Sequence, residues 1–191
     1  MFPVHTIESA PEESRAAMRR TAGPQGRVMP AVGRLASSPE LLNGFLALSA
    51  AFEGATLDAP AREVVVLTVA VRNGCETCVR MHTARLRGLD VAPEVVAALL
   101  EQRLLPDERL NSVWEFTLHV LETAGGVRRE AMDAFLRHGH TERNALEVVM
   151  GIGTYTLSTF ANRMTEGAGL DAQTRPPAPV REGARDLEHH S

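Results

Sequence analysis

The sequence predicts an all-α protein, and three observations carry that prediction. Apolar residues recur at helical spacing through most of the chain between its two Pro-rich ends. Proline, serine and glycine stand where helices would begin and end. No two-residue hairpin turn occurs, and no alternating apolar–polar run lasts beyond a few residues.

Each expected helix has a start or stop signal. Ser38 is a favoured cap and Pro39 a favoured first-turn residue for the run that follows them. Pro60 opens the next run, and Asn73-Gly74 closes it. In chain order, the expected helices cover residues 12–20, 41–52, 61–72, 75–86, 93–101, 107–123, 128–137 and 141–164.

One segment could form either a helix or a strand. Residues 64–71 read Val-Val-Val-Leu-Thr-Val-Ala-Val, and such β-branched content is typical of a buried strand. The length of the run and its punctuation favour a helix that is buried on nearly all sides. A weak internal repeat supports the helix, because residues 61–66 resemble residues 145–150, which lie in a long helical run. Gly151 and Gly153 follow the second copy and indicate close helix packing.

The chain has 191 residues, which predicts one domain, and its 44% apolar and 23% charged content is ordinary for a globular protein. We expect an N-terminal extension over 1–27, an all-helical domain over 28–166 and a flexible C-terminal tail over 167–191. The net charge of −4 disfavours nucleic acid or an anionic membrane as a partner. No secretory leader or membrane span is evident, so a cytoplasmic protein is expected.

The candidate catalytic residues include the two cysteines of the chain, Cys75 and Cys78. Their Cys-x-x-Cys spacing allows a disulfide, and His82 follows four residues later. Glu63 lies twelve residues before the first cysteine. An imidazole oriented by a carboxylate can activate a neighbouring thiol, so these four residues are the candidate catalytic residues of a thiol redox enzyme.

Helical geometry predicts that Glu63 and His82 meet. If Asn73-Gly74 folds one helix back on the other, Glu63 lies about 16 Å before the turn and His82 about 12 Å after it. In a strand, Glu63 would lie roughly 36 Å from the turn and the contact would be lost. Cys75, Cys78 and His82 share one face of the second helix, with Cys78 about one turn from His82.

The expected cycle begins with attack of the Cys78 thiolate on a peroxide and continues with condensation of the sulfenic acid with Cys75. Cys75 starts a helix, so we expect it to be the more exposed cysteine, open to an external dithiol reductant. A zinc site or inert thiols remain alternatives for the pair, and a non-enzymatic metal- or ligand-binding structural protein is the rival function. Without the cysteines, Glu63 would be interpreted as an acidic residue in the first turn of a helix, where the helix dipole favours a negative charge.

The motif resembles that of the AhpD-like alkylhydroperoxidases in the carboxymuconolactone decarboxylase superfamily. The resemblance rests on Glu63, the Cys75-x-x-Cys78 pair, His82-Thr83-Ala84 and the Gly88 break, and it extends to the segments 35–42 and 157–162. It implies an all-α fold, a homo-trimer or homo-hexamer, and Cys78 as the peroxide-reacting cysteine. We expect a lipoyl protein or a thioredoxin-like protein as the external dithiol reductant, and we expect no cofactor. Thr77 stands where the best-studied members carry a second histidine.

Five other residues are given no catalytic role. His119, His138 and His140 have no partners at a telling spacing, so surface or hydrogen-bonded histidines are expected. Trp114 and Phe116 lie on an amphipathic run and are expected in the core or at a subunit interface.

Overall fold

The computed structural model describes residues 2–166, and this part of the chain is all-α, as predicted. It contains nine helices and no strand. In chain order, these are α1 (Glu12–Thr21), α2 (Pro30–Leu35), α3 (Pro39–Glu53), α4 (Ala59–Arg72), α5 (Glu76–Gly88), α6 (Pro93–Leu100), α7 (Glu108–Thr123), α8 (Arg129–Arg137) and α9 (Glu142–Glu166).

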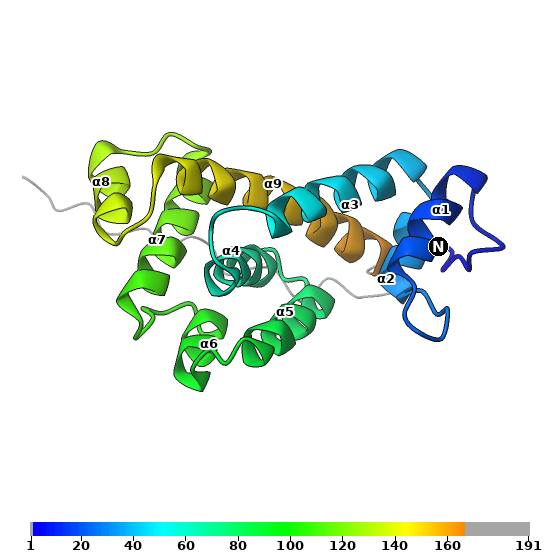
Figure 1. Cartoon of the computed structure of the whole chain (residues 1–191), viewed down its shortest axis with the longest axis horizontal. Coiled ribbons are helices and arrows are strands. Elements are labelled where there is room, and N and C mark those ends of the chain that lie inside the picture. The colour runs from blue at the N-terminus through cyan, green and yellow to red at the C-terminus, as the bar shows by residue number, and fades with distance from the viewer. Residues whose placement is uncertain (1, 167–191) are drawn as a thin grey trace, which may run out of the picture.

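Helix α4 lies at the centre of the fold, between α9, α5 and α7 (Figure 1). Eight of its residues in a row, from Glu63 to Ala70, are buried. The apolar ones supply the middle of the main core, together with residues of α6, α7 and α9. The helical interpretation of residues 64–71 is therefore confirmed, and burial on all sides explains why the segment is almost wholly apolar.

The hairpin between α4 and α5 is built by its turn residues. Asn73 ends α4, and Gly74 takes a positive φ of +65°. The amide of Gly74 donates to the Val71 carbonyl at 3.0 Å, and the amide of Cys75 donates to the Ala70 carbonyl at 3.0 Å. This is a Schellman arrangement, and it sets Cys75 at the cap of the next helix.

The expected close helix packing is confirmed at one of the two glycines, Gly151 of α9, which lies against α3 and α4. A Cβ atom on Gly151 would lie 2.6 Å from the Phe52 ring and 3.0 Å from a Val65 methyl, so only glycine fits there. The expectation is wrong for Gly153, which is exposed and would have no atom within 4 Å of its Cβ. The two positions are two residues apart and therefore face different sides of α9.

A second, smaller apolar cluster joins α1, α2, α3 and the end of α9. Met18 of α1 and Leu42 of α3 are both fully buried in it, with Ala161 of α9 alongside. Sequence analysis did not predict α2, the shortest of the described helices. The boundary between the extension over 1–27 and the domain stays a prediction, and the expected tail over 167–191 lies outside the described residues.

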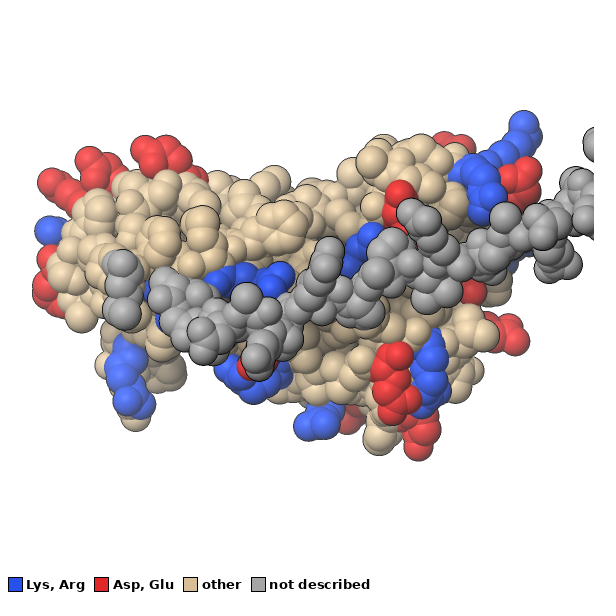
Figure 2. All heavy atoms as spheres, turned by 180° about the vertical axis from the view of Figure 1, so that it is seen from behind, with Lys and Arg blue, Asp and Glu red and all other residues tan. Residues whose placement is uncertain are grey.

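Acidic and basic side chains are both scattered over the face shown in Figure 2, as their interspersed order in the sequence predicts. Within residues 2–166, none of the helices combines the length and the apolar character needed to cross a membrane.

Candidate active site

The two cysteines form a disulfide at the start of α5. Cys75 is the cap of this helix, and its Sγ accepts the amide of Cys78 at 3.4 Å. The expectation that Cys75 is the more exposed cysteine is wrong, because Cys75 is 1% exposed and Cys78 5%. The Schellman turn folds Cys75 against Ala70 and Val79, so the helix start points into the protein.

Glu63 and His82 lie in contact across the hairpin, as the matched depths of the two helices predict. His82 Nδ1 is 2.7 Å from Glu63 Oε2, and the two side chains are only 6% and 5% exposed. Glu63 lies beyond the first turn of α4, so the alternative of a first-turn acid is wrong. Cys78 lies one turn before His82 on the same face of α5. A carboxylate, an imidazole and a sulfur therefore follow one another along the hairpin.

Arg85 also contacts the Glu63 carboxylate. Its Nε is 3.2 Å from Glu63 Oε1, and its Nη2 is 2.7 Å from Glu53 Oε1. Burial works against the charge of this guanidinium, but the Glu63 and Glu53 carboxylates outweigh it and raise the pKa of Arg85. A cavity of about 340 Å³ is lined by Glu63 and Arg85 together with Glu53 and Arg62, so the carboxylate end of the site opens toward solvent there.

Helix α9 covers the hairpin and contributes two residues that sequence analysis missed. The Tyr155 ring stands edge-on to the His82 ring, with centroids 5.3 Å apart, and burial raises the pKa of Tyr155. The amide Nδ2 of Asn162 lies 3.5 Å from Cys78 Sγ. Asn162 belongs to the segment 157–162 that shares the family resemblance, but nothing in its sequence spacing points to the cysteines.

The Thr77 side chain, between the two cysteines in the sequence, is held by residues that are not among the candidate catalytic residues. Its hydroxyl donates to the Glu166 carboxylate at 3.1 Å and accepts from Arg80 Nη2 at 3.1 Å. Glu166 is also paired with Arg34. The hydroxyl therefore connects the Cys-x-x-Cys turn to the end of α9.

The four candidate residues are not arranged as zinc ligands. The two sulfurs are bonded to each other, and the Glu63 carboxylate is engaged by His82 and Arg85. Within residues 2–166, no group of three or more His, Cys, Asp or Glu side chains is placed to hold a metal ion.

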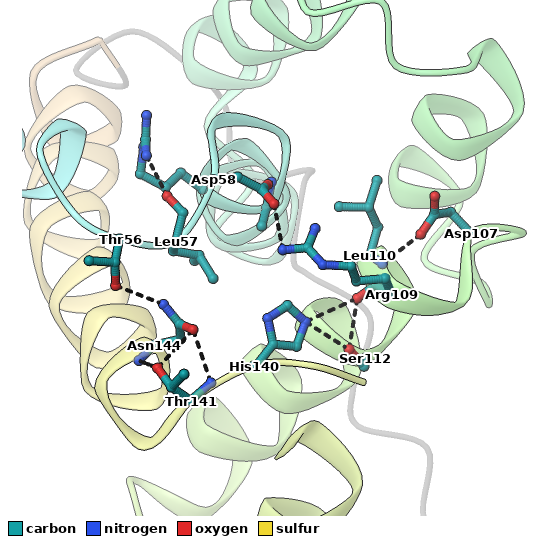
Figure 3. Close-up of polar contacts among 12 residues, drawn as sticks. Thr56, Leu57, Asp58, Asp107, Arg109, Leu110, Ser112, His140, Thr141 and Asn144 are labelled. Atoms are coloured by element: carbon teal, nitrogen blue, oxygen red, sulfur yellow. Dashed lines mark hydrogen bonds and ion pairs between the residues drawn. The ribbon is translucent and has the colours of Figure 1, made fainter. Parts of the chain in front are cut away.

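Glu147 occupies the position in the second copy of the internal repeat that Glu63 occupies in the first, and its role is structural. Its carboxylate accepts the amides of Thr56 and Leu57 at 2.9 and 2.8 Å, and Asn144 Nδ2 at 2.9 Å. Asn144 also donates to the Thr56 hydroxyl (Figure 3). Burial alone would raise the pKa of Glu147, but these hydrogen bonds lower it to about 2. Glu147 thus fixes the loop that leads into α4, the helix that carries Glu63.

We expect Glu147→Gln to destabilise the protein by about 2 kcal/mol at neutral pH, because a charged acceptor of several hydrogen bonds is lost. The pKa of this carboxyl is lowered from 4.5 to about 2 on folding, so its stabilising contribution is present above about pH 4.5 and is lost as the pH falls toward 2. Urea unfolding at a series of pH values measures this. Exposed Glu115 on α7 provides the control, Glu115→Gln. A gap between wild type and Glu147→Gln that does not change with pH would contradict the assignment.

The remaining histidines and aromatic residues lie as expected. His138 is exposed, and His119 accepts the Arg128 amide at 3.2 Å. His140 is buried, with its Nε2 3.1 Å from the Ser112 hydroxyl (Figure 3). Trp114 and Phe116 belong to the main core and are 7% and 3% exposed.

The fold and the site define an all-helical protein with a Cys-x-x-Cys disulfide on a central hairpin. Residues 39–117 match the model of the carboxymuconolactone decarboxylase family, a span that runs from α3 into α7 and contains all four candidate residues. Over this span the chain is similar to the carboxymuconolactone decarboxylase family, and its fold is AhpD-like. A search of curated proteins found no match.

Solved structures share this fold. An alkylhydroperoxidase AhpD core protein from Ralstonia eutropha JMP134, described as peroxidase-related, is 23% identical with a TM-score of 0.70, covering 87% of this chain and 88% of its own. A peroxidase-related protein from Silicibacter sp. TM1040 is 20% identical with a TM-score of 0.69, covering 87% and 86%. An Agrobacterium tumefaciens protein of unknown function, provisionally named as the antioxidant defence protein AhpD, is 22% identical with a TM-score of 0.58, covering 69% of this chain and 89% of its own. At these identities, the likeness concerns the fold.

Proposed function

We propose that the protein is a thiol-dependent peroxidase and disulfide oxidoreductase. The observation that carries the proposal is the buried Glu63–His82 contact of 2.7 Å on the hairpin that bears the Cys75–Cys78 disulfide. A carboxylate that orients an imidazole beside a redox-capable cysteine pair is the arrangement of an activated sulfur nucleophile. Relatives of the same fold are described as peroxidase-related or as antioxidant defence proteins, which agrees with this chemistry.

The carboxylate of Glu63 fixes the His82 ring through Nδ1, so Nε2 is the nitrogen left to exchange a proton with Cys78. The resulting thiolate attacks the peroxide, and the sulfenic acid that forms is resolved by Cys75 into the disulfide. Arg85 places its guanidinium against Glu63, so the buried carboxylate has a charged partner as well as the imidazole. Burial of both cysteines protects the sulfenic acid from unrelated thiols.

An external dithiol must then reduce the disulfide by exchange. Cys78 is the more exposed of the two cysteines, so we propose that the reductant attacks Cys78 and that Cys75 leaves first. A lipoyl protein or a thioredoxin-like protein supplies such a dithiol. The cycle needs a compartment that delivers reducing thiols, and we therefore propose that the protein acts in the cytoplasm.

Steady-state peroxide consumption with a set of dithiol donors tests this function. We expect turnover of hydrogen peroxide or an organic hydroperoxide with a lipoyl protein or thioredoxin, and none with the donor alone. Absence of turnover with every donor, while peroxide still oxidises the two thiols, would limit the protein to single-turnover chemistry and contradict a peroxidase.

We also propose that the protein forms a homo-trimer or homo-hexamer through one face of α9. Four large apolar side chains on this face are strongly exposed, at 72%, 48%, 57% and 61% for Leu146, Val149, Phe160 and Met164. Their positions fall within about 60° of each other around the helix, so they form one apolar stripe along its length. A stripe of this kind on an isolated subunit indicates an interaction surface, and a second copy of the chain is the occupant we propose.

The double variant Val149→Glu, Phe160→Glu is therefore expected to shift the protein from oligomer to monomer, because each buried carboxylate would lack a partner. Light scattering at micromolar concentration measures the mass. Leu104→Glu is the matched control, since Leu104 is 65% exposed in the loop before α7. A wild-type protein that is already monomeric would contradict the assembly, and an unchanged oligomer in the double variant would contradict this choice of face.

A further inference from the structure

The side chain of Asn162 lies beside the reacting sulfur in a position that the Glu63–His82 pair does not explain. Asn162 is 6% exposed, and its Nδ2 is 3.5 Å from Cys78 Sγ. Its other polar atom, Oδ1, is buried and has no hydrogen-bond partner among the described residues. Buried side-chain oxygens nearly always have a partner, so this oxygen is suited to a donor that arrives with a ligand. Because both atoms belong to one planar amide, that ligand would lie close to Cys78.

The chemistry of the disulfide fixes which end of the amide faces the sulfur. A disulfide sulfur carries no hydrogen and can only accept, so the NH₂ group is the end that forms a hydrogen bond to it. In the reduced protein, a Cys78 thiolate would accept the same hydrogen bond more strongly, because the acceptor is then charged. The amide oxygen would stay available on the same side of α9.

We propose that Asn162 is a catalytic residue that holds the Cys78 thiolate through Nδ2 and the terminal O–H group of a hydroperoxide through Oδ1. This inference rests on the proposed peroxidase function and assigns the group that orients its substrate. A hydroperoxide is the class of ligand that fits, since its terminal oxygen carries the hydrogen that Oδ1 needs and is also the atom that a thiolate attacks. Tyr155, two turns earlier on α9, lies against the His82 ring. Helix α9 therefore contacts both the proposed base, His82, and the proposed nucleophile, Cys78.

The step balances with the groups present. The Cys78 thiolate attacks the terminal oxygen, the S–O bond forms, the O–O bond breaks, and the leaving alkoxide takes the proton that His82 had received from the thiol. The transferred oxygen keeps its hydrogen, so Oδ1 holds the same O–H group as the hydroperoxide becomes a sulfenic acid. Cys75 then attacks Cys78, and the oxygen leaves as water with the Cys75 proton. Two thiols are oxidised to a disulfide, and the peroxide is reduced to an alcohol and water.

Two substitutions in a Cys75→Ser background test the two contacts separately. For Asn162→Ala, we expect the pH midpoint of Cys78 alkylation by iodoacetamide to rise by about one unit, the size of a hydrogen bond to a charged group. We also expect sulfenic acid formation with cumene hydroperoxide to be about tenfold slower at a pH where Cys78 is fully ionised. Asn162→Asp keeps an oxygen acceptor but loses the donor, so its midpoint should rise further while its rate at full ionisation falls less.

Asn73→Ala is the matched control, because Asn73 Nδ2 donates to Thr159 Oγ1 at 2.9 Å and so contributes to the same contact between the hairpin and α9 without facing the sulfur. It should keep the wild-type midpoint and rate, and circular dichroism should show equal helical content in all variants. A wild-type midpoint and rate in Asn162→Ala, beside an active parent protein, would overturn the Asn162 assignment alone. A parent protein that forms no sulfenic acid would overturn the proposed function and, with it, the peroxide contact.

Discussion

Replacing Cys78 by serine is expected to abolish peroxide-dependent formation of sulfenic acid, and replacing Cys75 by serine is expected to preserve it. Cys78 lies one turn from His82 on the same face of α5 and next to Asn162, so it has the groups that activate a nucleophile. Cys75 is 1% exposed and forms the cap of the helix, which suits a resolving thiol. A sulfenic acid probe with mass spectrometry distinguishes the two variants.

The Cys75→Ser variant should consume one equivalent of peroxide and then stop, because no disulfide can form for a reductant to open. Catalytic turnover should therefore be lost in both single variants, for different reasons. If Cys75→Ser is the variant that loses the sulfenic acid, the two roles are reversed. If both variants keep it, neither cysteine is a dedicated peroxide-reacting residue.

The second large effect is expected for Glu63→Gln. The carboxylate accepts from His82 Nδ1 at 2.7 Å and from Arg85 Nε at 3.2 Å, so glutamine keeps the shape but removes the negative charge between two donors. We expect the alkylation of Cys78 at pH 7 to slow by about tenfold and its pH midpoint to rise by about one unit, since glutamine removes the buried negative charge that orients the imidazole beside the thiol. Helical content should change little.

Glu53→Gln is the control for this experiment. Glu53 accepts from the same Arg85 at 2.7 Å but lies at the surface, and its side chain is 39% exposed. Its removal should leave the alkylation profile close to that of wild type. A Glu63→Gln protein that alkylates at the wild-type rate from pH 6 to 9, about the range in which an activated thiol titrates, would show that Glu63 is not coupled to Cys78.

Much of the fold follows from local signals in the sequence. The Ser38 side chain accepts the Leu41 amide at 3.2 Å, and Asn73-Gly74 forms the turn between α4 and α5. The Glu63–His82 contact could be predicted because it depends only on two helix rises and one short turn. Distances within a helical hairpin are set by local geometry, so a motif placed on such a hairpin can be built from the sequence.

The rest depends on tertiary packing. Asn162 follows Cys78 by 84 residues, and only the way in which α9 crosses the hairpin brings them together. The burial of Cys75 does not follow from its place at a helix start, because the turn at Gly74 folds that start inward. Helix α2 has six residues in a region rich in proline and glycine, and its packing against α3 and α9 supports it more than its own propensity does.

The most direct test of the central claim is a thiol count during stoichiometric oxidation. The reduced wild-type protein should show two free thiols, and one equivalent of an organic hydroperoxide should remove both while one equivalent of alcohol appears. Mass spectrometry should then find Cys75 and Cys78 joined, with no metal bound to the reduced protein. Two thiols that persist after the peroxide is added, or that are masked by a stoichiometric metal ion before it is added, would contradict a thiol peroxidase built on this hairpin.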